Sequence, residues 1–354
     1  MFAEAIQGAK FDATKTIDEL DHYLMDLGDF TFFIDQKRYK VTYSLGRKDA
    51  VLLRMFVDQY ISEEEMKEAM IDAFHLTFYK TSIEIKYPHF TFWVRQLLEE
   101  QYGKLASTKG WIVKTSLDPI IQEKAENLLK ENKPTLTKNG AHNSAMLYLD
   151  SNNGDVLAYV GSLDYYDKTI EGQNDMIQKP RQSGSSIKPL LYALGFMKLP
   201  LTLDTPIYDL FFKVSGGTVH NANGGFEGLL PLKKALGHSR NIPSVKMFYA
   251  VGGENIVKPF YKSLGITSLA DDFNYNYNLA LGGAEVPMIE LAQAYAHLTT
   301  RKTATINPII SITTKDGSEI YSKNLETDTQ EEIIPIGVKY LIWKILSDPN
   351  NRIS

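Results

Sequence analysis

A short polar stretch, Arg181-Gln182-Ser183-Gly184-Ser185-Ser186-Ile187-Lys188-Pro189, stands directly before an apolar run, Leu190–Met197. Ser185 and Lys188 are three positions apart, a spacing that places both side chains on one face of a helix. A serine hydroxyl is a poor nucleophile unless a base lies within hydrogen-bond reach. A lysine amine can be that base when burial or a nearby cation lowers its pKa. Gly184 would also let a substrate approach the backbone closely.

The same spacing has a simpler explanation, which stays open at this point. Ser-x-x-Lys is common enough to arise by chance in a chain of this size. Ser185 could cap the helix while Lys188 faces solvent, with no chemistry involved. The context of the stretch has to decide between the two.

A second motif, Ser239-Arg240-Asn241, lies between a helix-like run and an apolar run. Its serine could relay protons, and its asparagine amide could hold the peptide backbone of a substrate. Two other Ser-x-Asn triplets, at residues 151–153 and 322–324, fall in a hairpin turn and a polar loop. Only the copy at Ser239 is therefore well placed for chemistry.

The clearest secondary-structure signal is a β-hairpin at residues 144–160. Two apolar runs, 144–150 and 155–160, flank Ser151-Asn152-Asn153-Gly154. Asn-Gly between apolar runs favours a tight turn because both residues tolerate a positive φ. An α+β domain is expected to begin here.

The region before the hairpin carries no recognisable chemistry. Ser62-Glu63-Glu64-Glu65 resembles a catalytic cluster only superficially, because acidic residues in a first helical turn complement the helix dipole and form a capping box. The other elements expected here are one or two strands at 30–43, helices from residue 47 to about 76, a helix at 92–102 ended by Gly103, a strand at 111–115, a helix from Pro119 to about residue 131, and an irregular linker at 132–143.

The bulk composition excludes several classes of function. The chain has 354 residues and a formal charge of −5, which disfavours a nucleic-acid-binding surface. It has no cysteine, so disulfides, thiolate metal sites and cysteine nucleophiles are excluded. Its seven histidines show no metal-ligand spacing. We therefore expect no metal, no cofactor and no nucleic-acid partner.

Together the two motifs resemble those of penicillin-binding proteins, whose motif set is S-x-x-K, S-x-N and K-T-G. In order and spacing they look like the first two motifs of a bifunctional, class A member. The similarity runs from about residue 47 to 354, and its last piece looks most like the 1C subgroup. Leu279–Val286 with Leu291–Ala296 is similar to the family's long helix after the S-x-N motif. The other segments that carry the resemblance are Pro88–Phe90, Glu99–Gly103, Lys114–Asp118 with Gln122, and Tyr340–Arg352.

The resemblance implies an α+β penicillin-binding transpeptidase domain with helices around an antiparallel sheet. Ser185 would attack the carbonyl between two terminal D-alanines of a peptidoglycan stem peptide, and β-lactams would trap it. Lys188 would take its proton, and Ser239 would pass a proton to the leaving amine. An amine from a neighbouring strand, or water, would resolve the acyl-enzyme. The residues that would bind substrate are Asn241, Ser186 and Gly184.

The sequence also departs from the family pattern. The third motif, Lys-Thr/Ser-Gly, occurs nowhere, and its nearest matches, residues 138–140 and 315–317, read as turns. In the family that strand supplies an oxyanion-hole N–H, and losing one such donor costs roughly 100- to 1,000-fold in kcat. The motifs of the glycan-polymerising domain have no counterpart either. Ser183 stands where the family usually has proline. This difference is expected to affect a loop at most.

Three regions follow from the resemblance. They are an unassigned segment at 1–46, a remnant of the glycosyltransferase domain with the interdomain linker at 47–140, and a partial transpeptidase domain, incomplete at its C-terminus, at 141–354. Two functions stay open: an acyl-serine transpeptidase, and a truncated, non-catalytic remnant or peptide-binding module. A hydrolytic β-lactamase is disfavoured because the region before the hairpin resembles the bifunctional enzymes.

The resemblance places the protein at the outer face of the cytoplasmic membrane or in the periplasm. No apolar run in the sequence is long enough to cross a bilayer. The start, Met1-Phe2-Ala3-Glu4, lacks the pattern of a signal peptide. Any contact with a membrane is therefore expected through a segment absent from this chain.

Overall fold

The computed structural model describes residues 24–34, 37–44, 47–72, 85–214, 217–299, 303–324, 329–330 and 332–352. The chain divides into two compact units, Met1–Glu84 and Ile85–Ser354. Half of the segment predicted as unassigned, residues 1–23, lies outside the described residues. The predicted boundaries at residues 46 and 140 concern family regions and stay a prediction.

The first unit contains a hairpin and a pair of helices. Its antiparallel strands confirm the prediction for residues 30–43. The Ser62 N–H donates to the Glu65 carboxylate at 2.8 Å, and the Glu65 N–H donates to the Ser62 hydroxyl at 3.2 Å, which confirms the capping box. The elements are β1 (Leu24–Ile34), β2 (Lys37–Ser44), α3 (Arg47–Val57) and α4 (Glu63–Asp72).

The first half of the second unit is built around the predicted hairpin. The hairpin, the strand at 111–115 and the helix ended by Gly103 are all confirmed. The elements are α5 (Pro88–Tyr102), β3 (Ile112–Thr115), α6 (Pro119–Lys138), β4 (Met146–Asp150) and β5 (Asp155–Val160).

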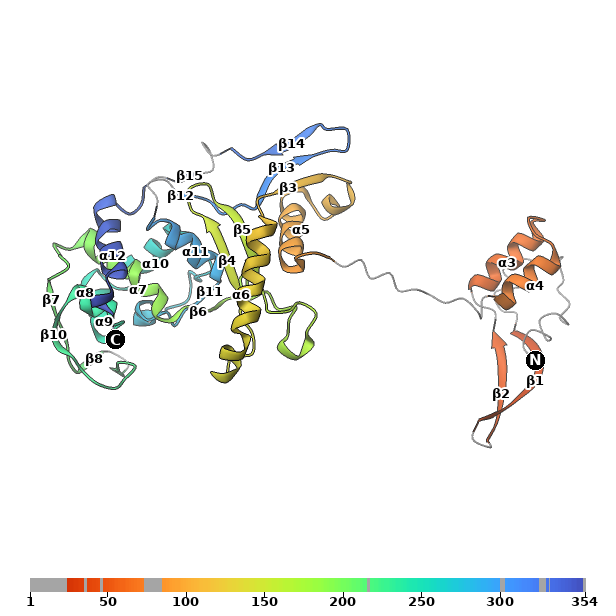
Figure 1. The fold of residues 1–354 in the computed structure, drawn as a ribbon, viewed down its shortest axis with the longest axis horizontal. Coiled ribbons are helices and arrows are strands. Elements are labelled where there is room, and N and C mark those ends of the chain that lie inside the picture. Colours follow the sequence, from red (N-terminus) through yellow and green to blue (C-terminus); the bar gives the residue numbers. More distant parts are fainter. Residues whose placement is uncertain are drawn as a thin grey trace. The chain divides into compact units, whose positions relative to one another are not determined.

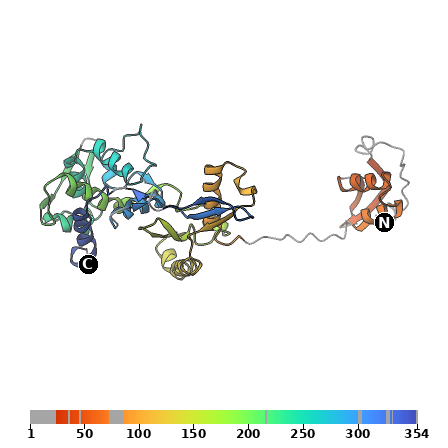
Figure 2. The ribbon, with the colours of Figure 1, turned by 90° about the horizontal axis from the view of Figure 1, so that it is seen from above.

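One extra residue in β5 changes which side chains of the hairpin face each of its two flanking helices. Leu157 is left unpaired as a β-bulge, so the strand's side-chain alternation shifts there. Val156 and Tyr159 consequently share one face and pack in a cluster with α5. Ala158 and Val160 share the opposite face and pack against α6. Figures 1 and 2 show the hairpin between α5 and α6.

The irregular linker predicted at residues 132–143 is wrong over its first half, because α6 continues to Lys138. Pro134 lies inside the helix. Proline lacks the N–H that would pair four residues back, so it leaves one carbonyl of the helix without its usual partner. The helix tolerates it here because its last turns are exposed, where water can serve the freed carbonyl. The Asn132 amide and the Thr137 hydroxyl also donate to backbone carbonyls one turn earlier.

A three-stranded antiparallel sheet in the order β14-β13-β3 packs beside α5, as Figure 1 shows. The turn predicted at 315–317 joins β13 to β14, and the turn predicted at 138–140 ends α6, so both are confirmed. The short strands of this unit are β6 (Arg181–Gln182), β7 (Pro206–Asp209), β8 (Phe212–Val214), β9 (Gly217–Val219), β10 (Gly228–Pro231), β11 (Glu285–Val286), β12 (Thr303–Ala304), β13 (Ile309–Thr313), β14 (Glu319–Ser322) and β15 (Thr329–Gln330).

The second half of the unit is helical, with α7 at its centre. Every residue from Lys188 to Phe196 in α7 is buried, because α8, α9, α10 and α12 pack around it. A 3-10 turn, Gly184–Ile187, leads directly into α7. The helices are α7 (Lys188–Lys198), α8 (Leu232–Gly237), α9 (Asn241–Ala250), α10 (Glu254–Ser263), α11 (Met288–Ala296) and α12 (Ile336–Ser347).

The long helix expected across residues 279–296 is wrong in its first part. A 3-10 turn, Asn276–Ala280, is followed by a glycine turn and by strand β11, and α11 begins only at Met288. Gly282 has φ +71, which a helix cannot contain. This turn brings β11 against β6, next to the predicted nucleophile.

The α+β architecture with helices around antiparallel strands is as predicted. None of the helices in the described ranges is long and apolar enough to cross a membrane.

Candidate active site

Ser185 lies on an exposed 3-10 turn at the entrance to the buried helix α7. The loop before it is held by backbone pairing: the Gly184 N–H donates to the Gly282 carbonyl at 3.0 Å. A Cβ at Gly282 would lie 2.0 Å from the Gly184 carbonyl oxygen, so only glycine fits there. Within the described parts of the chain, the Ser185 hydroxyl makes no hydrogen bond. Its position leaves it open to a substrate.

Lys188 lies one turn further on and is 1% exposed. Its ammonium nitrogen donates to the Ser239 carbonyl at 2.7 Å, to the Ser239 hydroxyl at 3.3 Å and to Asn241 Oδ1 at 2.7 Å. The structure therefore brings the lysine of the first motif onto both polar residues of the second. The solvent-facing lysine of the simpler explanation is excluded.

Burial lowers the pKa of Lys188 from 10.5 to about 8, and the nearby positive charge of Arg240 adds to the effect. Neither its two carbonyl acceptors nor a hydroxyl brings a negative charge to compensate for the lost hydration. At pH 7 about a tenth of this amine is neutral and able to accept a proton, far more than for an ordinary lysine.

The lowered pKa of Lys188 predicts a pH dependence. The neutral amine predominates above about pH 8, so the rate of acylation at Ser185 is expected to rise about tenfold per pH unit below that value and to level off above it. The unfolded chain holds this proton up to about pH 10.5, so the lysine's contribution to stability also rises with pH between the two values. Acylation by a fluorescent penicillin, timed from pH 6 to 10, measures the first effect. A flat profile would contradict the role of Lys188 as a base.

Ser239 has a left-handed backbone, with φ +55. It follows α8 as the residue that closes the helix, since its N–H donates to Leu236 and the next N–H donates to Ala235. Glycine or asparagine is usual at this position, and a serine there costs about 1 kcal/mol. The left-handed turn points the Ser239 carbonyl and hydroxyl together at Lys188. Strain of this kind is typical of functional sites.

Asn241 is the first residue of α9. Both the oxygen and the nitrogen of its side-chain amide are hydrogen-bonded. Its oxygen accepts from Lys188, and its Nδ2 donates to the His220 carbonyl at 2.9 Å. Its backbone N–H donates to Asn221 Oδ1 at 2.9 Å. The predicted substrate-binding residue is thus also a residue that holds Lys188 in place.

Ser186, also predicted to bind substrate, helps to close the 3-10 turn that carries Ser185. Its hydroxyl donates to the Ser183 carbonyl at 2.6 Å. The Tyr295 hydroxyl donates to the Ser186 carbonyl at 2.5 Å, and burial raises the pKa of this tyrosine to about 12. Tyr295 therefore stays a hydrogen-bond donor at physiological pH.

A buried ion pair beneath the second motif was missed from the sequence. Arg240 is 3% exposed, and its Nε donates to Asp209 of β7 at 2.7 Å. Asp209 also accepts from Asn221 at 2.8 Å, and Asn221 in turn holds Asn241. The only sign of it in the sequence was the position of Arg240, between Ser239 and Asn241 and next to an apolar helix. An arginine that is buried there needs a carboxylate partner. Nothing local indicates which of the many acidic residues that partner is.

Comparisons with known proteins support the same region. A family model described as the penicillin binding protein transpeptidase domain matches residues 144–314. Penicillin-binding protein 1B of Vibrio cholerae is 28% identical over 287 residues, which is 78% of this chain and 36% of the relative. Penicillin-binding protein 1C of Escherichia coli is 28% identical over 255 residues, 70% of this chain and 30% of the relative. The chain thus spans about a third of the length of these relatives.

Other relatives show that the similarity is not confined to one subgroup. Penicillin-binding protein 1A of Pseudomonas aeruginosa is 31% identical over 193 residues, 52% of this chain and 22% of the relative. Among solved structures, the penicillin-binding protein PonA1 of Mycobacterium tuberculosis superposes with a TM-score of 0.62 at 21% identity, covering 73% of this chain and 68% of that one. Its complex with penicillin V superposes with a TM-score of 0.61 at 20% identity, over 73% of this chain and 69% of that one.

Proposed function

We propose, from the premise that this chain belongs to the class A penicillin-binding proteins through its transpeptidase domain, that it is a serine acyltransferase acting on peptidoglycan stem peptides. The observation that carries the proposal is the position of Lys188. It is a buried amine with a lowered pKa, one turn from an exposed serine and in contact with Ser239 and Asn241.

The proposed first step forms an acyl-enzyme. The Ser185 oxygen attacks the carbonyl between the two terminal D-alanines, and its proton passes to the neutral Lys188 amine. The C–N bond breaks, and the leaving amine of D-alanine takes up a proton relayed through the Ser239 hydroxyl, which lies 3.3 Å from Lys188. Asn241 holds the donor peptide by its remaining amide hydrogen while keeping Lys188 in place.

The second step returns the enzyme to its starting state. An amine of a neighbouring strand attacks the ester carbonyl of Ser185, the C–O bond breaks, and a proton from the amine passes to the Ser185 oxygen, so that an amide cross-link is released. When water attacks instead, the same bond breaks and a carboxylic acid is released. We place this reaction at the outer face of the cytoplasmic membrane. β-Lactams are proposed as inhibitors that acylate the same serine, in keeping with the penicillin V complex of PonA1, whose fold resembles this one.

Intact-mass spectrometry after incubation with penicillin tests the proposal. We expect one covalent adduct on the parent chain, no adduct on Ser185→Ala, and an undiminished adduct on the neighbouring control Ser183→Ala. An adduct that persists in Ser185→Ala would refute the assignment of the nucleophile.

One observation favours the alternative, a non-catalytic remnant: no Lys-Thr/Ser-Gly triplet occurs in the 354 residues. Absence of any adduct on a chain that circular dichroism shows to be folded would support that alternative and exclude the acyltransferase.

A further inference from the structure

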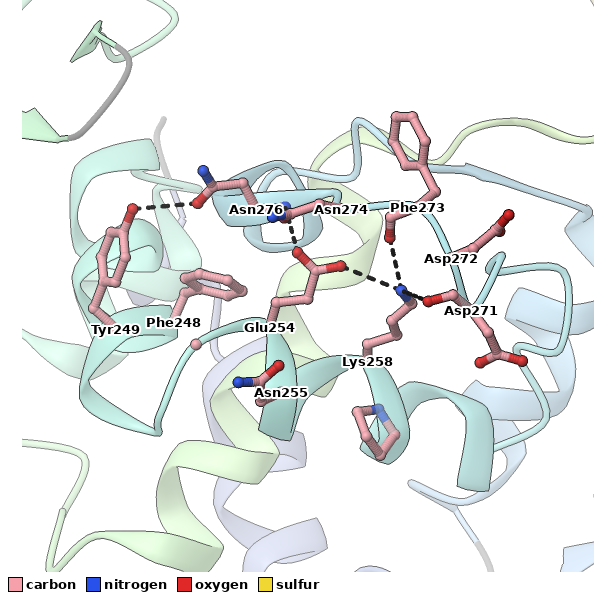
Figure 3. A pocket seen from close by; sticks show the side chains of 12 residues that line it. Phe248, Tyr249, Glu254, Asn255, Lys258, Asp271, Asp272, Phe273, Asn274 and Asn276 are labelled. Atoms are coloured by element: carbon pink, nitrogen blue, oxygen red, sulfur yellow. Dashed lines mark hydrogen bonds and ion pairs between the residues drawn. The ribbon is translucent and has the colours of Figure 1, made fainter.

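A cavity lies on the helical half of the second unit, and Lys188 is not among the residues that line it. The end of α9, the start of α10 and the loop at 271–276 line this open cavity of about 550 Å³ (Figure 3). This volume lies within the range of small-molecule sites. The proposed acyl transfer uses none of its lining residues.

The loop at 271–276 is held rigidly by two side chains of α10. The Glu254 carboxylate accepts the backbone N–H groups of Tyr275 at 3.0 Å and Asn276 at 2.6 Å. One turn later, Lys258 donates to the Phe273 carbonyl at 2.7 Å and lies 3.4 Å from Glu254 (Figure 3). All of these contacts are to backbone atoms of the loop, so Glu254 and Lys258 hold the loop in place whatever its side chains are.

The loop that Glu254 and Lys258 hold carries an aromatic ring that faces solvent. Phe273 is 58% exposed and Tyr249, at the end of α9, is 41% exposed. Figure 3 shows the two side chains on opposite sides of the cavity, with Glu254 and Lys258 between them. Isolated exposed aromatic residues are ordinary, but two of them at the rim of one cavity, one on a rigid loop, are typical of recognition.

The polar groups of the rim select the chemistry of a ligand. The exposed side chains of Asn255, Asn274 and Asn276 offer amide donors and acceptors. Among the described lining residues the one cation, Lys258, already binds Glu254 and two backbone carbonyls, while exposed carboxylates add negative charge. The charge of the rim therefore disfavours an anionic ligand. A neutral ligand rich in hydroxyls and amides, with apolar ring faces, matches both the amides and the aromatic rings.

We propose that this cavity binds a neutral amino-sugar glycan of the N-acetylated, β-1,4-linked kind, with Tyr249 and Phe273 as stacking platforms. A second cavity of about 630 Å³ shares Asp272 and Phe273 with the first and reaches Gln182, three residues before Ser185. A glycan strand in this groove would lead to the nucleophile loop. The inference rests on the proposed function in so far as the glycan is that of peptidoglycan.

Calorimetric titration of the full chain with the N-acetylglucosamine tetramer tests the site. We expect saturable binding by the parent chain, and a loss of affinity of about tenfold in each of Phe273→Ala and Tyr249→Ala. The matched control Tyr340→Ala removes an equally exposed ring from α12 and is expected to bind like the parent. Cellotetraose, which has the same linkage without acetamido groups, is expected to bind at least about tenfold more weakly.

The outcomes separate this proposal from the proposed function. No binding by the parent chain, equal binding by Phe273→Ala, or equal affinity for cellotetraose would overturn the glycan site. Penicillin acylation is expected to be unchanged in Phe273→Ala and Tyr249→Ala. A chain that binds the tetramer but is never acylated would leave the glycan site standing and refute the acyltransferase.

Discussion

Replacing Lys188 with methionine is expected to lower the rate of acylation by penicillin about 10²- to 10⁴-fold, the range typical of losing a general base. Methionine has a similar length and suits a buried site, but it cannot accept the Ser185 proton. The second-order rate constant for a fluorescent penicillin measures the loss.

A matched control is available at the other end of the same helix. Lys198 is exposed in the last turn of α7, so Lys198→Met is expected to be acylated like the parent. The Lys188 variant leaves the Ser239 carbonyl and Asn241 Oδ1 without their donor, so thermal melting has to show that it is folded. A folded Lys188→Met chain acylated within about threefold of the parent rate would contradict the mechanism, because a general base accounts for far more than that.

Replacing Asp209 with alanine is expected to lower the free energy of unfolding of the second unit by about 3–5 kcal/mol. It removes the fully buried acceptor of Arg240 Nε and leaves only the partly exposed Glu227 carboxylate, 3.2 Å away, as a counter-charge. The same change releases Asn221, which holds the backbone of Asn241. Acylation is therefore expected to slow as well, in the molecules that remain folded. Denaturant unfolding of the parent and the variant measures the stability effect.

Two further variants make this test specific. Asp204 pairs with Lys233 at 2.6 Å but is 75% exposed, so Asp204→Ala is expected to leave stability unchanged. The double change Asp209→Leu with Arg240→Met removes both charges, and we expect it to be more stable than Asp209→Ala alone. A single Asp209→Ala variant as stable as the parent would show that the buried pair does not support the motif.

Most of the local structure could be predicted because it depends on neighbouring residues. The hairpin at 144–160, the capping box at Ser62 and the helix ended by Gly103 each follow from a few adjacent side chains. The two errors are opposite in kind. Helix α6 runs through Pro134 into the predicted linker because its exposed end tolerates the proline, whereas the predicted long helix is broken at Gly282 because the turn has to approach Gly184 closely.

The resemblance to the family could also be recognised from the sequence, and the family model that matches residues 144–314 bears it out. Relatives of the 1A, 1B and 1C types have similar identities, 28 to 31%, so the comparisons support the class more firmly than the 1C subgroup. The roles of Ser185, Lys188, Ser239 and Asn241 stay a proposal, and the contacts among the last three support it.

The sequence by itself determined which side chains were candidates, because nucleophile, base and amide are properties of residue types at short spacings. Only the tertiary structure decided that Lys188 is buried against the second motif, that Ser239 is left-handed, and that Asp209 neutralises Arg240. The first and the last of these features depend on pairs far apart in the chain, Lys188 with Ser239 and Asp209 with Arg240. The packing of α7 among four other helices is what buries Lys188. Burial then changes the chemistry: in water Lys188 would be a cation, and in the core its pKa falls low enough for it to act as a base.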